Sequence, residues 1–130
     1  MSLWDIYKAM KLKDAWKKSF NKWDEQWELG GIGSSNGAPY SSSSSIRSKN
    51  FCECEGDQTY YFRGTFAVYW YAEDKSFIKT DYAGNNTKVA PSNAAYFKIA
   101  CYEAYGTSYK NDICVNVSGK HNGEYVPYNG

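Results

Sequence analysis

The sequence predicts a mainly β fold, in which an antiparallel β-sandwich follows an N-terminal α-helical segment. Two observations lead to this prediction. Residues 1–29 hold four of the five tryptophans but only one of the 13 tyrosines. The rest of the chain alternates short aromatic or β-branched runs with clusters of Gly, Asn, Asp, Ser and Pro, which is typical of short strands joined by turns. A chain of 130 residues fits one such domain and an appended segment.

The first 29 residues show a helical period. Ser2 is suited to cap a helix that begins at Leu3, and the pair Gly30-Gly31 would end it. Between them, four large aromatic residues are spaced i, i+4, i+7 and i+11, which would place their rings on one stripe of a helix. These residues are Trp16, Phe20, Trp23 and Trp27. An isolated helix of this length is marginal, so the stripe must pack on the strand half, on another copy or on a different protein.

We therefore predict a helical docking segment over residues 1–29, with that aromatic stripe as its partner-binding surface. Residues 30–45 contain Gly33, Gly37 and the run Ser41–Ser45, which predicts a Gly/Ser-rich linker or an extended first strand. Residues 46–130 are predicted to form the β-sandwich domain. Its strands are expected over residues 46–54, 59–66, 67–71, 76–80, 95–102 and 113–117. Turns are expected over residues 55–57, 73–75, 83–86, 91–93 and 118–119.

Charge is distributed unevenly along the chain. The formal net charge is +1, which gives no overall attraction to nucleic acid or to an anionic membrane. Residues 1–22 nevertheless carry six lysines against two aspartates. Because this stretch has no arginine and no base-reading pattern, the lysines are interpreted as the solvated face of a docking helix. No apolar run approaches the roughly 20 residues of a membrane span, and no secretory signal is visible, so neither a membrane nor nucleic acid is an expected partner.

The residues that usually carry catalysis form no recognisable set. The single histidine, His121, has no nucleophile motif near it, and no phosphate-cradling loop or zinc-protease motif occurs. We therefore expect no enzymatic activity and no cofactor. The pair Cys52 and Cys54, with Cys101 and Cys114 far away, lacks a standard zinc spacing, so no metal is expected. Buried reduced thiols are favoured, while disulfides, which need an oxidising compartment, stay open.

The strand half holds more tyrosines than one small core is expected to absorb. Packing within a sandwich or at a subunit interface is the favoured explanation. The alternative is a carbohydrate-binding surface, because flat aromatic rings stack on sugars and hydroxyl groups bond to them. For that alternative the candidate glycan-binding residues are Tyr69, Trp70, Tyr71 and Tyr102.

Several ordered pieces of residues 46–128 resemble a known module. These pieces are IRSKNFCEC followed by GDQTYYF, VYWYAEDKSFI, APSNAAYFKIACYE, NDICVNVSG and NGEYVPY. Together they resemble a module of tail, baseplate and other minor structural proteins of bacteriophages and prophages of Gram-positive bacteria. The chain departs from that module at Cys52 and Cys54, where aliphatic residues are usual. It also stops just after the module, so a receptor-binding head would be missing or supplied by another chain.

The resemblance implies a jelly-roll-like β-sandwich, similar to carbohydrate-binding modules. It also implies a non-enzymatic virion protein of a tail, baseplate or fibre-like structure, assembled in the cytoplasm of the bacterial host. Its expected partners are other virion proteins and further copies of itself, with a trimer among the states considered, and a host-surface glycan is a candidate ligand. The alternative function is a carbohydrate-binding module that recognises a bacterial cell-surface glycan.

Overall fold

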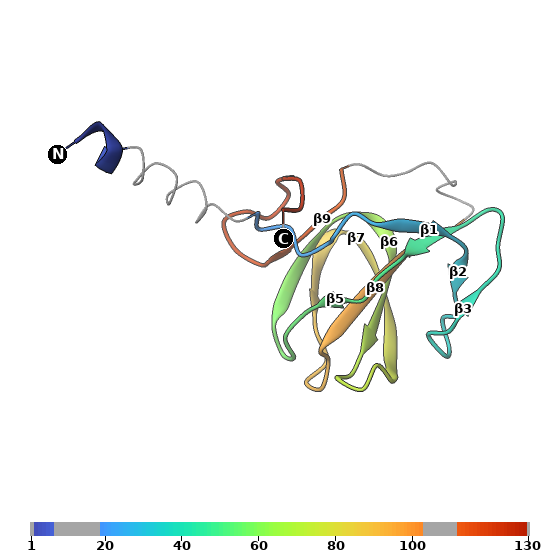
Figure 1. Ribbon diagram of the computed structural model, residues 1–130. Coiled ribbons are helices and arrows are strands. Elements are labelled where there is room, and N and C mark those ends of the chain that lie inside the picture. Colours follow the sequence, from blue (N-terminus) through green and yellow to red (C-terminus); the bar gives the residue numbers. More distant parts are fainter. Residues whose placement is uncertain (1, 7–18, 103–111, 130) are drawn as a thin grey trace.

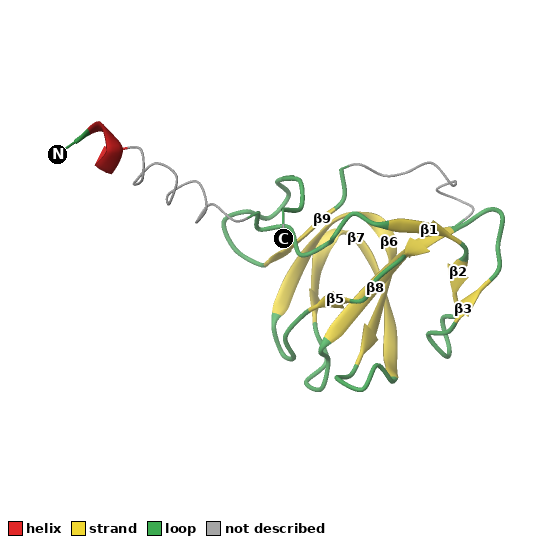
Figure 2. Ribbon diagram, in the orientation of Figure 1, coloured by secondary structure: helices red, strands yellow, loops and turns green. Residues whose placement is uncertain are grey.

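The computed structural model describes residues 2–6, 19–102 and 112–129. These residues form a mainly β protein, built from one curled antiparallel sheet and a separate two-stranded ribbon (Figures 1 and 2). The sheet contains β1 (Trp27–Leu29), β4 (Ile46–Ser48), β5 (Cys52–Glu53), β6 (Thr59–Tyr71), β7 (Phe77–Val89), β8 (Tyr96–Cys101) and β9 (Cys114–Val117). The ribbon consists of β2 (Gly31–Ile32) and β3 (Pro39–Tyr40). The mainly β prediction is confirmed, whereas the two-sheet jelly roll stays a prediction.

Strand β6 is the centre of the sheet. Along one side it pairs with β7, and along the other it pairs first with β9 and then with β8. The order β1-β4-β8-β6-β7 extends the sheet, with β5 also paired to β8. Figure 1 shows that this sheet is curled. Buried side chains from its strands form the main hydrophobic core.

The long hairpin β6–β7 differs from the prediction in two places. The strands expected over 59–66 and 67–71 form one continuous strand, and the turn expected over 83–86 lies inside β7. Gly64 and Asn85 both have positive φ angles, of 120° and 53°, and the Asn85 side chain accepts the backbone N–H of Gly64. The pairing register shifts at this point. The turn-type residues therefore produce a β-bulge within a strand pair, not a chain reversal.

Both faces of the second half of β6 are buried. Its inner face, which bears Phe66, Val68 and Trp70, looks into the main core. Its outer face, which bears Ala67, Tyr69 and Tyr71, lies under a second, smaller cluster. The main core is aromatic, and the rings of Phe62 and Trp70 meet edge to face with centroids 6.1 Å apart.

Residues 19–29 are not helical, so the prediction of a helix up to Leu29 is wrong there. Side chains satisfy the local backbone donors: Ser19 Oγ accepts the N–H of Asn21, Asn21 Oδ1 accepts that of Trp23, and Asp24 Oδ1 accepts that of Gln26. Such bonds to the residue two positions on replace the partners that a helix would supply, and they hold the backbone in turns. The chain then enters β1 at Trp27.

A single helical turn is described at residues 3–6. Ser2 Oγ accepts the backbone N–H of Asp5, and an Asp5 carboxylate oxygen accepts the backbone N–H of Ser2, which together form a capping box. Ser2 therefore caps this turn, as the sequence predicts, whereas an N-terminal helical segment stays a prediction. The helix expected over residues 7–18 lies outside the described residues.

Residues 19–45 are tied to the sheet, where the sequence predicted a docking segment and a linker. Asn21 Nδ2 donates to the carbonyl of Val126, and a Glu25 carboxylate oxygen accepts the hydroxyl of Tyr125. Further along, Ile32 is only 2 % exposed and belongs to the outer cluster. These contacts make residues 19–45 part of the β domain.

Candidate functional site

Trp23 lies in the main core and is completely buried. Its ring meets that of Trp27 edge to face, with centroids 4.8 Å apart, and Trp27 packs partly buried against the same core. The aromatic stripe was expected to pack on the strand half, on another copy or on a different protein. Trp23 and Trp27 pack on the strand half of their own chain. Trp23 as a partner-binding residue is therefore wrong, because no part of its ring remains accessible.

The other two residues of the stripe do not complete it. Phe20 is half-buried and stacks on His121, with ring centroids 4.2 Å apart and planes within 8°. Trp16 lies outside the described residues. Because residues 19–29 are not helical, Phe20, Trp23 and Trp27 do not share one stripe.

Three of the four candidate glycan-binding residues are buried. Tyr69 and Trp70 are fully buried and Tyr71 is 3 % exposed, so none of them offers a ring face to a sugar. Their assignment as glycan-binding residues is wrong. The rings of Tyr69 and Tyr71 lie under the ribbon, and that of Trp70 lies in the core. Tyr102 is half-buried, and its hydroxyl group is already bonded within the chain.

The covering element is the segment of residues 30–40, which we call the strap. Tyrosine hydroxyl groups donate to its backbone. Tyr69 of β6 and Tyr102, just after β8, both donate to the carbonyl of Ile32, at 3.0 and 2.7 Å. Tyr71 of β6 donates to the carbonyl of Gly37, at 2.8 Å. Burial raises the pKa of Tyr71 and of Tyr102 to about 12. The strand half has more tyrosines than one small core is expected to absorb. Tyr69, Tyr71 and Tyr102 instead hold the strap as a second layer on the outer face of the sheet.

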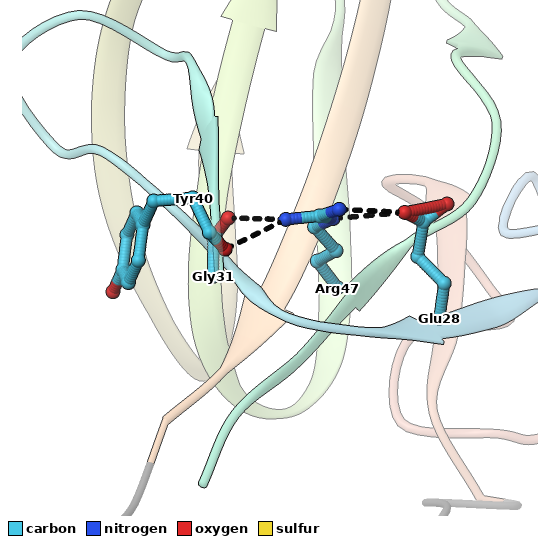
Figure 3. Close-up of polar contacts among 4 residues, drawn as sticks. All are labelled: Glu28, Gly31, Tyr40 and Arg47. Carbon is cyan, nitrogen blue, oxygen red and sulfur yellow. Dashed lines mark hydrogen bonds and ion pairs between the residues drawn. The ribbon is translucent and has the colours of Figure 1, made fainter. Parts of the chain in front are cut away.

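Arg47 of β4 holds both ends of the strap (Figure 3). Its Nε and Nη2 donate to one carboxylate oxygen of Glu28, at 3.0 and 2.8 Å. Its Nη1 donates to the carbonyls of Gly31 and Tyr40, at 3.0 and 2.9 Å. A side chain at Gly30, whose φ is +132°, would collide with this guanidinium. The fork geometry of arginine allows one side chain to bind three separate groups at once.

A polar cleft of about 660 Å³ opens between residues 19–24 and the segment around β5. We call it the acidic cleft, because Asp24, Glu53 and Glu55 line it against one base, Lys22. Within the described part of the chain, none of these three carboxylates forms an ion pair. Apolar surface also lines the cleft, from Phe51, Val117 and Tyr128. Val117 and Tyr128 are 44 % and 43 % exposed.

Two cysteines, Cys52 and Cys54, line this cleft, but their thiols are poor nucleophiles. Burial raises the pKa of the Cys52 and Cys54 thiols to about 12, and nearby carboxylates add to the effect. A thiol with such a pKa is protonated at neutral pH and reacts slowly. In residues 2–6, 19–102 and 112–129, no group of three or more His, Cys, Asp or Glu side chains is placed to hold a metal ion.

Exposed apolar side chains gather in the helical turn at residues 3–6. Leu3 is 85 % exposed, Trp4 61 % and Ile6 42 %. Large apolar groups concentrated in one turn are a feature of interaction surfaces. No helix among the residues described here is long and apolar enough to cross a bilayer.

The acidic cleft and the strap were not predicted from the sequence. Glu53 and Glu55 alternate with the two cysteines in the order CECE, a signal that they flank one strand edge, but Asp24 joins them only through the fold. The chain matches no protein-family model, no curated protein and no solved structure.

Proposed function

We propose that this chain is a non-enzymatic structural protein of a bacteriophage virion, in which residues 1–18 dock on a neighbouring protein and the β domain forms a rigid body. The observation that carries the docking role is the exposure of Leu3, which is 85 %, beside Trp4 and Ile6 in one capped turn. In the β domain the largest aromatic side chains, such as Trp23 and Trp70, pack inside the domain's own core. Exposed apolar side chains also occur on the β domain, where Tyr82 is 65 % and Leu29 60 % exposed, but among the described residues only the opening turn places three of them within four positions.

The chemistry of the domain favours binding over catalysis. His121 is bonded to Glu124 at 3.0 Å and stacked on Phe20, and the thiols of Cys52 and Cys54 have a pKa of about 12. The virion setting rests on the resemblance of residues 46–128 to a phage module, as does the description of the curled sheet as a jelly-roll variant. A glycan-binding role is less favoured, because Tyr69, Trp70 and Tyr71 are covered.

Incorporation into particles tests this function. Tagged chains would be expressed in the host that produces the phage, and purified particles would be probed for the tag. Wild type should be present, whereas the double variant Leu3→Asp/Ile6→Asp should be depleted. Burying each of these side chains contributes about 1.5–3 kcal/mol, so losing both should weaken docking at least about a hundredfold.

The matched control is Thr87→Asp/Asn93→Asp, which adds the same charges at exposed positions of the β domain. Both double variants should unfold at the wild-type temperature, and the control should be incorporated normally. A wild-type chain that is absent from the particles would refute the virion role. A Leu3→Asp/Ile6→Asp chain that is incorporated at the wild-type level would refute docking through the opening segment.

A further inference from the structure

The acidic cleft carries an excess of negative charge. Asp24, Glu53 and Glu55 face a single ammonium group, that of Lys22, and none of the three carboxylates has an ion pair in the described residues. Carboxylates gathered in a concave surface repel one another and attract cations. At about 660 Å³, the cleft is of the size that commonly holds a ligand or a peptide side chain, about 300–1,000 Å³.

The cleft also offers apolar surface beside these charges. Val117 and Tyr128, which are 44 % and 43 % exposed, line it together with the half-buried Phe51. A small cation would leave these side chains uncovered. An occupant that satisfies the whole cleft has cationic and apolar side chains within a short length of chain.

Residues 1–18 of this chain have that composition. They carry five lysines against two aspartates, a net charge of +3, and they hold several large apolar residues. The lysines are Lys8, Lys11, Lys13, Lys17 and Lys18. The apolar residues include Leu3, Trp4, Ile6, Met10, Leu12 and Trp16. The segment therefore complements the cleft in both charge and apolar character.

We propose that the acidic cleft of one copy binds residues 1–18 of a second copy. The proposal rests on the docking function above and names its partner. Residues 2–6 do not occupy the cleft of their own chain: Leu3 is 85 % exposed, and none of residues 2–6 lines the cleft. Ser19, which directly follows residues 1–18, lines the cleft. The segment of each copy is therefore attached beside the cleft that would bind the segment of another copy.

Such a contact joins two different surfaces, a segment and a cleft. Repeated from copy to copy it is heterologous, and it generates a closed ring or an open filament. Both are forms in which one protein is used many times in a particle. Attraction between lysines and carboxylates across the contact also makes the association sensitive to salt.

A charge exchange tests the proposal in the full chain. Light scattering coupled to size exclusion would measure the mass at several protein concentrations, at low and at high salt. Wild type should associate, less so at high salt. The cleft variant Glu53→Lys/Glu55→Lys and the segment variant Lys11→Glu/Lys17→Glu should each weaken association at least tenfold. The control Lys49→Glu/Lys120→Glu, at exposed lysines outside the cleft, should associate like wild type.

A mixture of the two charge-reversed chains provides the decisive measurement. The cleft of the first chain then faces the segment of the second with opposite charges, so the mixed complex should be tighter than the association of either variant alone. A wild-type chain that stays monomeric would overturn the proposal, as would a cleft variant that associates like wild type.

These outcomes are separable from those of the particle experiment. A monomeric chain whose Leu3→Asp/Ile6→Asp variant still fails to enter particles would retain the docking function and refute the second copy as partner. In the opposite case the chain associates through the cleft while its Leu3→Asp/Ile6→Asp variant enters particles normally. That result would support binding to a second copy and refute the docking function in the particle.

Discussion

The side-chain oxygen of Asn21 accepts the backbone N–H of Val115 at 3.0 Å, although 94 residues separate them. The same oxygen accepts the N–H of Trp23 at 3.0 Å, and Asn21 Nδ2 donates to the carbonyl of Val126 at 3.1 Å. Asn21 is 2 % exposed. One buried amide thus joins the segment before β1 to β9 and to the residues that follow it.

Replacing Asn21 with alanine should destabilise the domain by about 2 kcal/mol or more. The change leaves buried backbone donors without an acceptor, and each such group costs about 1–3 kcal/mol. Urea unfolding followed by tryptophan fluorescence would measure it. The control is Lys22→Ala, at the exposed neighbouring position, which should stay within about 0.5 kcal/mol of wild type. Equal stabilities of the two variants would contradict this role for Asn21.

Two fully buried tryptophans differ in one hydrogen bond, which allows a paired comparison. Trp70 Nε1 donates to the carboxylate of Asp81 at 2.8 Å, whereas Trp23 Nε1 has no partner among the described residues. Trp70→Phe should therefore cost about 1–2 kcal/mol more than Trp23→Phe, because only the first change breaks a bond to a charged group. Thermal unfolding of the two variants would test this. A larger cost for Trp23→Phe would show that packing, not the bond, dominates.

Arg47→Lys should loosen the strap while keeping the charge. A lysine cannot bind the carboxylate of Glu28 and the carbonyls of Gly31 and Tyr40 in one fixed geometry. The amide of Gly33, which donates to the carbonyl of Ala38 within the strap, should then exchange with deuterium about tenfold faster. The control Lys49→Arg changes an exposed cation of the same sheet region. Unchanged protection of Gly33 would mean that the tyrosine hydroxyls suffice.

Alkaline pH should weaken the domain through Tyr71. Burial raises its pKa to about 12, above the value of about 10 in an unfolded chain. The resulting stabilisation is fully present below about pH 10 and is lost as the pH rises through about 12. In Tyr71→Phe the free energy of unfolding should therefore fall less steeply between pH 10 and pH 12 than in wild type.

Tyr71→Phe also removes the hydrogen bond to Gly37, so Thr80→Val serves as a control variant that removes a comparable bond. Thr80 Oγ1 donates to the carbonyl of Ser34 in the same strap at 2.8 Å, but it does not titrate. That variant should be less stable than wild type at every pH and show the same slope. Identical slopes for wild type and Tyr71→Phe would refute the titration of Tyr71 as a cause.

The sequence predicts strands better than it predicts what covers them. Alternation along β6 correctly separates Trp70 from Tyr69 and Tyr71, and both faces are apolar enough to be buried. Whether the outer face meets a sugar, a subunit or the chain itself depends on the strap, which reaches it only in the folded state. The assignment of a glycan site failed for that reason.

The error over residues 19–29 has a local cause. The aromatic spacing favours a helix, but Ser19, Asn21 and Asp24 are residues whose short side chains compete for backbone donors. In the fold the competing bonds prevail, because Trp23 gains burial in the core and Asn21 gains partners on β9. The acidic cleft was missed for a related reason, since Asp24 reaches Glu53 and Glu55 only after this turn has formed.

The bonds of Asn21 to Val115 and Val126 also constrain the order of events on the ribosome. Strand β4 can pair with β8 only after β8 has been synthesised. The turn around Asn21 gains its bonds to Val115 and Val126 only when residues more than 90 positions later have been added. The hairpin β6–β7 forms from neighbours in sequence and is available much sooner. The segment around Asn21 therefore emerges from the exit tunnel before its partners on β9 and beyond have been synthesised.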